Sequence, residues 1–125
     1  MSNLILIRGD KATLAISGLL DDQGNPTVFG IGDVLTWTAK QHFTTTDSTA
    51  LIVKSSTDTG IDITTGTDQA TVHIAPSDWD TLGPLTRDLK FVWDLQLEVG
   101  GDPSQIVTLD SGRGTIKADV TLTIP

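Results

Sequence analysis

Apolar and polar residues alternate with a period of two along much of the chain. The clearest run spans residues 89–99, where every second residue from Leu89 to Val99 is apolar and most residues between them are polar. Successive side chains of a β-strand point to opposite faces, so this pattern predicts a strand with one buried face and one hydrated face. Residues 115–124 repeat the pattern and predict a second long strand.

Shorter runs of the same period predict further strands, about eight in all when residues 4–7 are counted. Segments rich in Gly, Asn and Asp separate them, and these residues supply the backbone conformations and local hydrogen bonds that turns require. Turns are expected at 21–26, 56–60, 64–69, 99–104 and 110–114. The inward-facing residues of two short strands are expected to be Ala12, Leu14 and Ile16, and Leu35, Trp37 and Ala39.

One segment, residues 76–82, reads as a short helical turn, opened by Pro76 and Ser77 and followed by Gly83 and Pro84. No segment is long enough for a crossover helix between parallel strands. The prediction is therefore all-β: a single domain over residues 1–125, an immunoglobulin-like antiparallel β-sandwich of about 7–9 strands. Trp37 and Trp93 are expected to pack between its two sheets.

The composition supports this class and limits the partners. The chain has twenty Thr, twelve Gly and only one Glu beside fifteen Asp, a mixture poor in helix formers. Its formal charge of −8 disfavours nucleic acid and anionic membrane surfaces, since both reward clustered Lys and Arg. There is no cysteine, and the N-terminal apolar run of four residues is too short for a signal peptide or membrane span. We expect synthesis in a cytoplasm and no membrane insertion.

Residues with the chemistry of catalysis are few and scattered. His42 and His73 have no partner at a metal-ligand spacing, and no serine lies in a nucleophile elbow. We therefore expect no enzyme activity, no cofactor and no catalytic metal. Asp58, Asp62 and Asp68 lie in or beside neighbouring turns, and the sequence leaves open whether they converge on a weak cation site.

The tripeptide Arg8-Gly9-Asp10 matches the motif that integrins recognise. It lies between two strand-like runs, where glycine allows the chain to bend or to change sheet and Asp can bond to nearby backbone. We interpret it as a structural bend.

The order of the motifs resembles a known family. The pair Gly9-Asp10 and the turn at 21–26 are followed by a strand ending at Lys40, then by Gly60-Ile61-Asp62-Ile63 and the proline-led turn at 76–82. The segments 93–96 and 114–121 complete the series, with Trp93 where a tyrosine is usual. This series resembles the immunoglobulin-like domains of tailed-phage virion proteins, in particular the N-terminal domain of baseplate upper proteins.

The resemblance implies a non-enzymatic structural protein in the tail, baseplate or fibre-attachment region of a bacteriophage. Its partners would be other phage structural proteins or further copies of the chain, and its location would be the virion after synthesis in the host bacterial cytoplasm. Candidate assembly contacts are Leu4, Ile5, Leu6 and Ile7, a short apolar segment at the start of the chain. The alternative for Leu4 and Leu6 is that they complete the domain's own core.

Two other functions remain open at this point. A ligand-binding module would recognise a bacterial surface glycan or a host protein through loops at one end of the sandwich, and Phe43 and Trp79 are its candidate contacts. A capsid decoration protein would use the same fold elsewhere on the particle.

Overall fold

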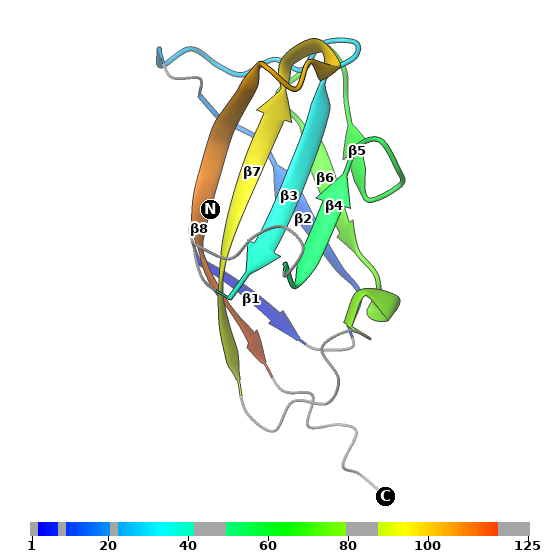
Figure 1. Ribbon diagram of the computed structural model, residues 1–125, viewed down its shortest axis with the longest axis vertical. Coiled ribbons are helices and arrows are strands. Elements are labelled where there is room, and N and C mark those ends of the chain that lie inside the picture. The colour runs from blue at the N-terminus through cyan, green and yellow to red at the C-terminus, as the bar shows by residue number, and fades with distance from the viewer. Residues whose placement is uncertain (1–2, 8–9, 21–22, 42–49, 80–87, 118–125) are drawn as a thin grey trace, which may run out of the picture.

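Two β-sheets packed face to face form the protein (Figure 1). The computed structural model describes residues 3–7, 10–20, 23–41, 50–79 and 88–117. The larger sheet has the strand order β1-β8-β7-β3-β4 and the smaller sheet the order β2-β6-β5. The strands are β1 (Asn3–Ile7), β2 (Ala12–Ile16), β3 (Val34–Lys40), β4 (Ile52–Ser55), β5 (Ile61–Ile63), β6 (Ala70–Ile74), β7 (Leu89–Glu98) and β8 (Ile106–Lys117).

The strand order is that of an immunoglobulin-like sandwich, as the sequence predicts. Strands β8-β7-β3-β4 correspond to G-F-C-C′ of such domains, and β2-β6-β5 to B-E-D. Neighbouring strands run antiparallel, with one exception: β1 lies parallel to β8, with Leu4 beside Gly114. No hairpin joins β1 to β8, which lie at opposite ends of the described chain, so no turn imposes an antiparallel direction on them.

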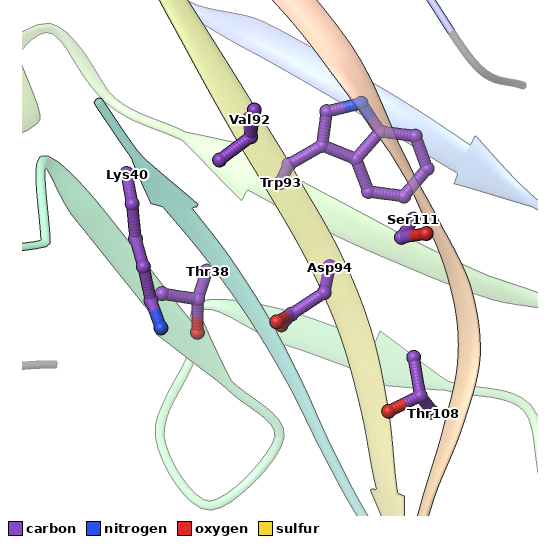
Figure 2. A pocket seen from close by; sticks show the side chains of 7 residues that line it. All are labelled: Thr38, Lys40, Val92, Trp93, Asp94, Thr108 and Ser111. Carbon is purple, nitrogen blue, oxygen red and sulfur yellow. The ribbon is translucent and has the colours of Figure 1, made fainter. Parts of the chain in front are cut away.

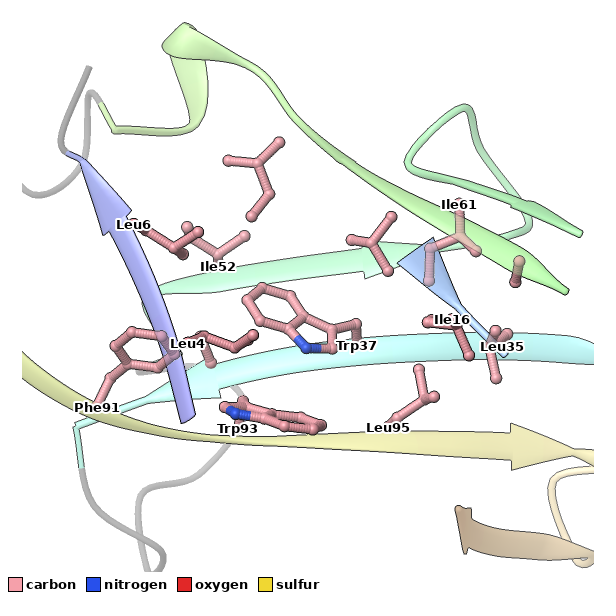
Figure 3. Packing of buried hydrophobic residues seen from close by; sticks show 14 of the residues in the cluster. Leu4, Leu6, Ile16, Leu35, Trp37, Ile52, Ile61, Phe91, Trp93 and Leu95 are labelled. Atoms are coloured by element: carbon pink, nitrogen blue, oxygen red, sulfur yellow. The ribbon is translucent and has the colours of Figure 1, made fainter. Parts of the chain in front are cut away.

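The core lies between the sheets and contains the predicted inward residues. Leu35, Trp37 and Ala39 are buried, and Ala12 and Leu14 pack against the core beside buried Ile16. Figure 3 shows the rings of Trp37, Trp93 and Phe91 among aliphatic side chains from β1, β2, β4 and β5. With no cysteine in the chain, this packing takes the place of the disulfide found between the sheets of antibody domains.

The predicted turn at residues 110–114 is wrong, because β8 runs without interruption from Ile106 to Lys117. Of its two glycines, Gly114 serves the packing of the neighbouring strand. Gly114 lies opposite Phe91, and a Cβ atom on Gly114 would come within 2.3 Å of the Phe91 ring and 2.8 Å of the Leu4 carbonyl oxygen. A glycine at position 114 therefore leaves room for the Phe91 ring, which lies in the core against the inner face of the sheet.

The prediction that Val99 faces the core is also wrong. The alternation along β7 predicts that it faces the core, but β7 ends at Glu98 and Val99 begins a 3₁₀ turn, η3 (Val99–Gly101), with 42% of its surface exposed. Gly100 and Gly101 both have positive φ, which ends the alternating pattern one residue earlier than the apolar side chains suggest.

The connections elsewhere follow the predictions. Pro76–Trp79 forms a 3₁₀ turn, η2, while residues 80–82 of the predicted helical turn lie outside the described part. The Asp10 N–H donates to the Ile7 carbonyl at 3.1 Å between β1 and β2, which belong to different sheets, as the bend interpretation requires. Arg8 and Gly9 themselves are not described.

An ion pair joins η2 to the larger sheet. The Lys54 ammonium on β4 lies 2.6 Å from an Asp78 carboxylate oxygen, and this oxygen also accepts the Ala75 N–H at 2.7 Å. Lys54 occupies an inward position opposite Trp37, so its charge is largely sheltered and η2 supplies the counter-charge.

Candidate functional site

Strand β1 divides the four candidate assembly residues into two pairs. Leu4 and Leu6 are buried in the domain's own core, so they are not available at the surface. Ile5 and Ile7 point to the other face of the sheet, and Ile5 has 64% of its surface exposed. The candidate contact on β1 is therefore reduced to two isoleucines.

The outer face around β1 also carries basic side chains. In the register of the sheet, Ile5 lies beside Thr115 of β8, and Ile7 lies beside Lys117. Lys90 of β7 lies on the other side of Thr115 and is exposed, as is Arg113. We call the surface formed by Ile5, Ile7, Lys90, Arg113 and Lys117 the β1 face.

A second group of exposed apolar residues lies at the opposite end of the sandwich. Leu20, Val28 and Ile31 belong to the connection between β2 and β3, and Val99 and Ile106 flank the β7–β8 hairpin. Figure 1 shows both connections at the end of the sandwich away from the β1 arrowhead. The two connections touch, since a Cβ atom on Gly101 would lie 3.1 Å from the Gly32 carbonyl oxygen.

Asp33 holds these two connections together. One carboxylate oxygen accepts the Gly30 N–H at 2.8 Å and the other accepts the Gly100 N–H at 2.8 Å. The Asp33 N–H donates back to the Gly30 carbonyl at 3.2 Å, which closes a tight turn around Ile31. Ile31, with 92% of its surface exposed, is thus presented on a turn that is already ordered before any partner arrives.

The charges at this end are acidic. The connections 17–33, 64–69 and 99–105 contain no Lys or Arg, whereas Asp33, Asp68 and Asp102 lie on them and Glu98 adjoins the last. The Ser104 backbone N–H and then its hydroxyl donate to Asp102 and hold the pKa of that carboxyl below its usual value. The end therefore stays negatively charged. We call the surface formed by Ile31, Val99, Ile106, Glu98 and Asp102 the loop end.

The sequence leaves open whether Asp58, Asp62 and Asp68 converge, and in the structure Asp58 and Asp62 line one hollow, whose lining does not include Asp68. Asp58 accepts the Gly60 N–H at 2.6 Å, Asp62 lies 2.7 Å from the Nε2 atom of His73, and Asp68 accepts the Gly18 N–H at 2.9 Å. Within the described ranges, no three His, Cys, Asp or Glu side chains form a group that could hold a metal ion. Asp58 therefore closes its own turn, Asp62 on β5 pairs with His73 of the neighbouring strand β6, and Asp68 joins its turn to the connection that follows β2.

Described residues line hollows at two places on the surface. One, of about 290 Å³, lies beside the loop end and is lined by polar and acidic residues from three connections and β5, among them Asp33, Asp58 and Thr65. The other, of about 180 Å³, lies on the larger sheet between β3, β7 and β8 (Figure 2). Its lining is Thr38, Lys40, Val92, Trp93, Asp94, Thr108 and Ser111.

The aromatic ligand contacts proposed from the sequence are not tested. Phe43 lies outside the described residues, and for Trp79 only the backbone, in η2, is described. The residue that sequence reasoning missed is Ile31. Its signal was present as Gly30-Ile31-Gly32, an apolar residue between two glycines and outside any alternating run, which is typical of an exposed turn.

Among the described residues no helix is long and apolar enough to cross a membrane. Comparison of the chain with known protein families finds no family that matches it, and comparison with curated proteins finds no match.

Proposed function

We propose that the chain is a non-enzymatic structural protein of a tailed-bacteriophage virion, in its tail, baseplate or fibre-attachment region. It acts by binding other structural subunits. The proposal starts from the sequence motifs that resemble immunoglobulin-like domains of such virion proteins. The immunoglobulin-like strand order of the two sheets is compatible with that resemblance.

The observation that carries the proposal is the composition of the edge strand β1. Edge strands of monomeric proteins are usually protected by charged side chains, proline or bulges, because their backbone can pair with another chain. The edge strand β4 carries the inward-pointing Lys54, and β5 carries Asp62. The edge strand β2, with the sequence Ala-Thr-Leu-Ala-Ile, also has no charge, but its exposed residues are the small Thr13 and Ala15, whereas β1 exposes two isoleucines. Strand β1, with the sequence Asn-Leu-Ile-Leu-Ile, has no charge and no proline, and its outer side has no neighbouring strand among the described residues. It is suited to contact with another subunit.

The test of the proposal is the protein content of purified particles. Phage particles from a host infected with the virus that encodes the chain would be banded in a density gradient and analysed by quantitative mass spectrometry. We expect the chain in several copies per particle, in a constant ratio to the major tail protein. Its absence from particles that contain the known tail proteins would rule the proposal out.

A second candidate function is favoured by the hollow beside the loop end. Sandwiches of this class often bind ligands with the loops at one end, and the hollow offers the hydroxyls of Ser56, Thr59 and Thr65. We expect the isolated, fluorescently labelled chain not to bind host cells. If it did bind, and Thr65→Trp abolished the binding while Thr13→Trp, at an exposed site on β2, did not, the ligand-binding function would replace it.

A further inference from the structure

We infer that copies of this chain associate head to tail, with the loop end of one copy docked on the β1 face of the next. The inference rests on the proposed function in one respect, since it names a second copy as the partner of the same edge strand. It adds a second surface, the loop end, and a direction to the contact.

Both surfaces have the exposed apolar side chains that protein contacts bury. Seven of the eight large apolar residues exposed in the described part lie on β1, on the connections at the opposite end of the sandwich, or, for Ile106, on the first residue of β8 beside them; Val53 on β4 is the eighth. Ile31 projects from its turn, and Ile5 and Ile7 lie on a strand whose outer side is open. Because Asp33 accepts the backbone N–H groups of Gly30 and Gly100, the turn that carries Ile31 loses little conformational freedom when it binds.

The charges of the two surfaces favour one of the three possible pairings, which are loop end with loop end, β1 face with β1 face, and loop end with β1 face. The loop end carries Glu98 and Asp102 and no basic residue. The β1 face carries Lys90, Arg113 and Lys117 together with the Asp88 carboxylate, which lies 3.4 Å from the Lys117 ammonium, so the basic groups outnumber this carboxylate. In a chain of net charge −8, two loop ends would repel each other, and so would two β1 faces. The pairing of a loop end with a β1 face places opposite charges together, and it is the pairing we infer.

Such a contact is heterologous, because it joins two different surfaces of the same chain. Heterologous contacts generate rings when the rotation between neighbours closes and filaments when it does not. Each copy in such an assembly uses both surfaces, so blocking either one is enough to stop growth.

Because each copy uses both surfaces, the inference can be tested with variants in which one surface is blocked. Two variants block one surface each: Ile31→Lys places a positive charge in the loop end, and Ile5→Glu places a negative charge in the β1 face. Molar mass would be measured by light scattering for each variant alone and for their equimolar mixture. The matched control is Val53→Glu, which also adds a charge at an exposed residue of an edge strand, on the opposite edge of the same sheet.

We expect the wild type and Val53→Glu to associate at low salt, and each blocking variant alone to fall to the 13.3 kDa of one chain. The mixture is expected to regain a higher mass, because the Ile31→Lys chain keeps an intact β1 face and the Ile5→Glu chain keeps an intact loop end. Raising the salt from about 0.05 to 0.5 M is expected to weaken the association by screening the charges.

Other outcomes overturn the inference. If only one of the two variants dissociates, the contact pairs a surface with itself. If the mixture stays at the mass of one chain, or if Val53→Glu dissociates as well, the two surfaces do not form the contact. If the wild-type chain stays at 13.3 kDa at all soluble concentrations, it does not self-associate and the inference is wrong. The proposed virion role would still hold if the chain is found in particles.

Discussion

Trp37→Ala is expected to lower the free energy of unfolding by about 3–5 kcal/mol, the usual cost of removing a large buried aromatic side chain. Trp37 is fully buried, and its ring fills the space between the sheets beside Leu4, Leu6 and Ile52 (Figure 3). Because domains of this size have a total stability of about 5–15 kcal/mol, the loss is a large part of the whole. Urea unfolding followed by far-UV circular dichroism measures it.

Trp37→Phe is the matched control for that substitution. It keeps most of the ring and removes the indole Nε1–H, which is buried without a hydrogen-bond partner in the described structure. An unpartnered polar group contributes no stability where it lies, so Trp37→Phe is expected to cost much less than Trp37→Ala. Equal losses for the two variants would show that the ring does not pack as described.

Gly114→Ala is expected to destabilise the sandwich by about 1–3 kcal/mol or more, through steric overlap rather than through a lost contact. The added Cβ would lie 2.3 Å from the Phe91 ring on one side and 2.8 Å from the Leu4 backbone oxygen on the other. Gly30→Ala is the control, since the nearest atom to its Cβ is a carboxylate oxygen of Asp33 at an ordinary 3.7 Å.

A double-mutant cycle with Phe91→Leu identifies the cause of that loss. If the Phe91 ring is the obstacle, the double variant is expected to be more stable than the sum of the two single effects predicts. If the losses of unfolding free energy in the two single variants, measured by chemical denaturation, simply add up in the double variant, Gly114 is needed for another reason, such as the path of the strand backbone.

The alternation of side chains made most of the fold predictable. Trp37, Ala39 and Ile16 lie where their spacing predicts, because a strand against a core leaves one face in water and one face buried. The turn residues were equally informative. Gly24 and Gly66 have positive φ in the predicted turns, where a residue with a side chain would be strained.

One failure comes from an interaction between distant strands, and the other comes from two patterns that overlap at one residue. Residues 110–114 have the composition of a turn, and only the partner strand shows that Gly114 is small in order to accommodate Phe91. Val99 both continues the alternating pattern and begins the turn predicted at 99–104, and the structure places it in the turn. A local sequence signal cannot report contacts that depend on which strands become neighbours.

The candidate surfaces were predictable only in part. The apolar run at residues 4–7 was correctly placed on a strand, but which of its side chains face outward depends on its pairing with β8. The loop end could not be assembled from sequence, because Ile31 and Val99 are separated by 67 intervening residues and meet only through Asp33 and the close approach of two glycines.

The most direct test of the proposed virion role is a cryo-electron microscopy map of the purified particle. We expect density for this sandwich in the tail, baseplate or fibre-attachment region. The copies are expected to be related by rotational symmetry, and β1 of each copy is expected to be buried against a neighbouring subunit. A map at side-chain resolution that has every subunit of these regions assigned, and contains no such sandwich, would contradict it. Density on the capsid instead would identify a decoration protein with the same fold.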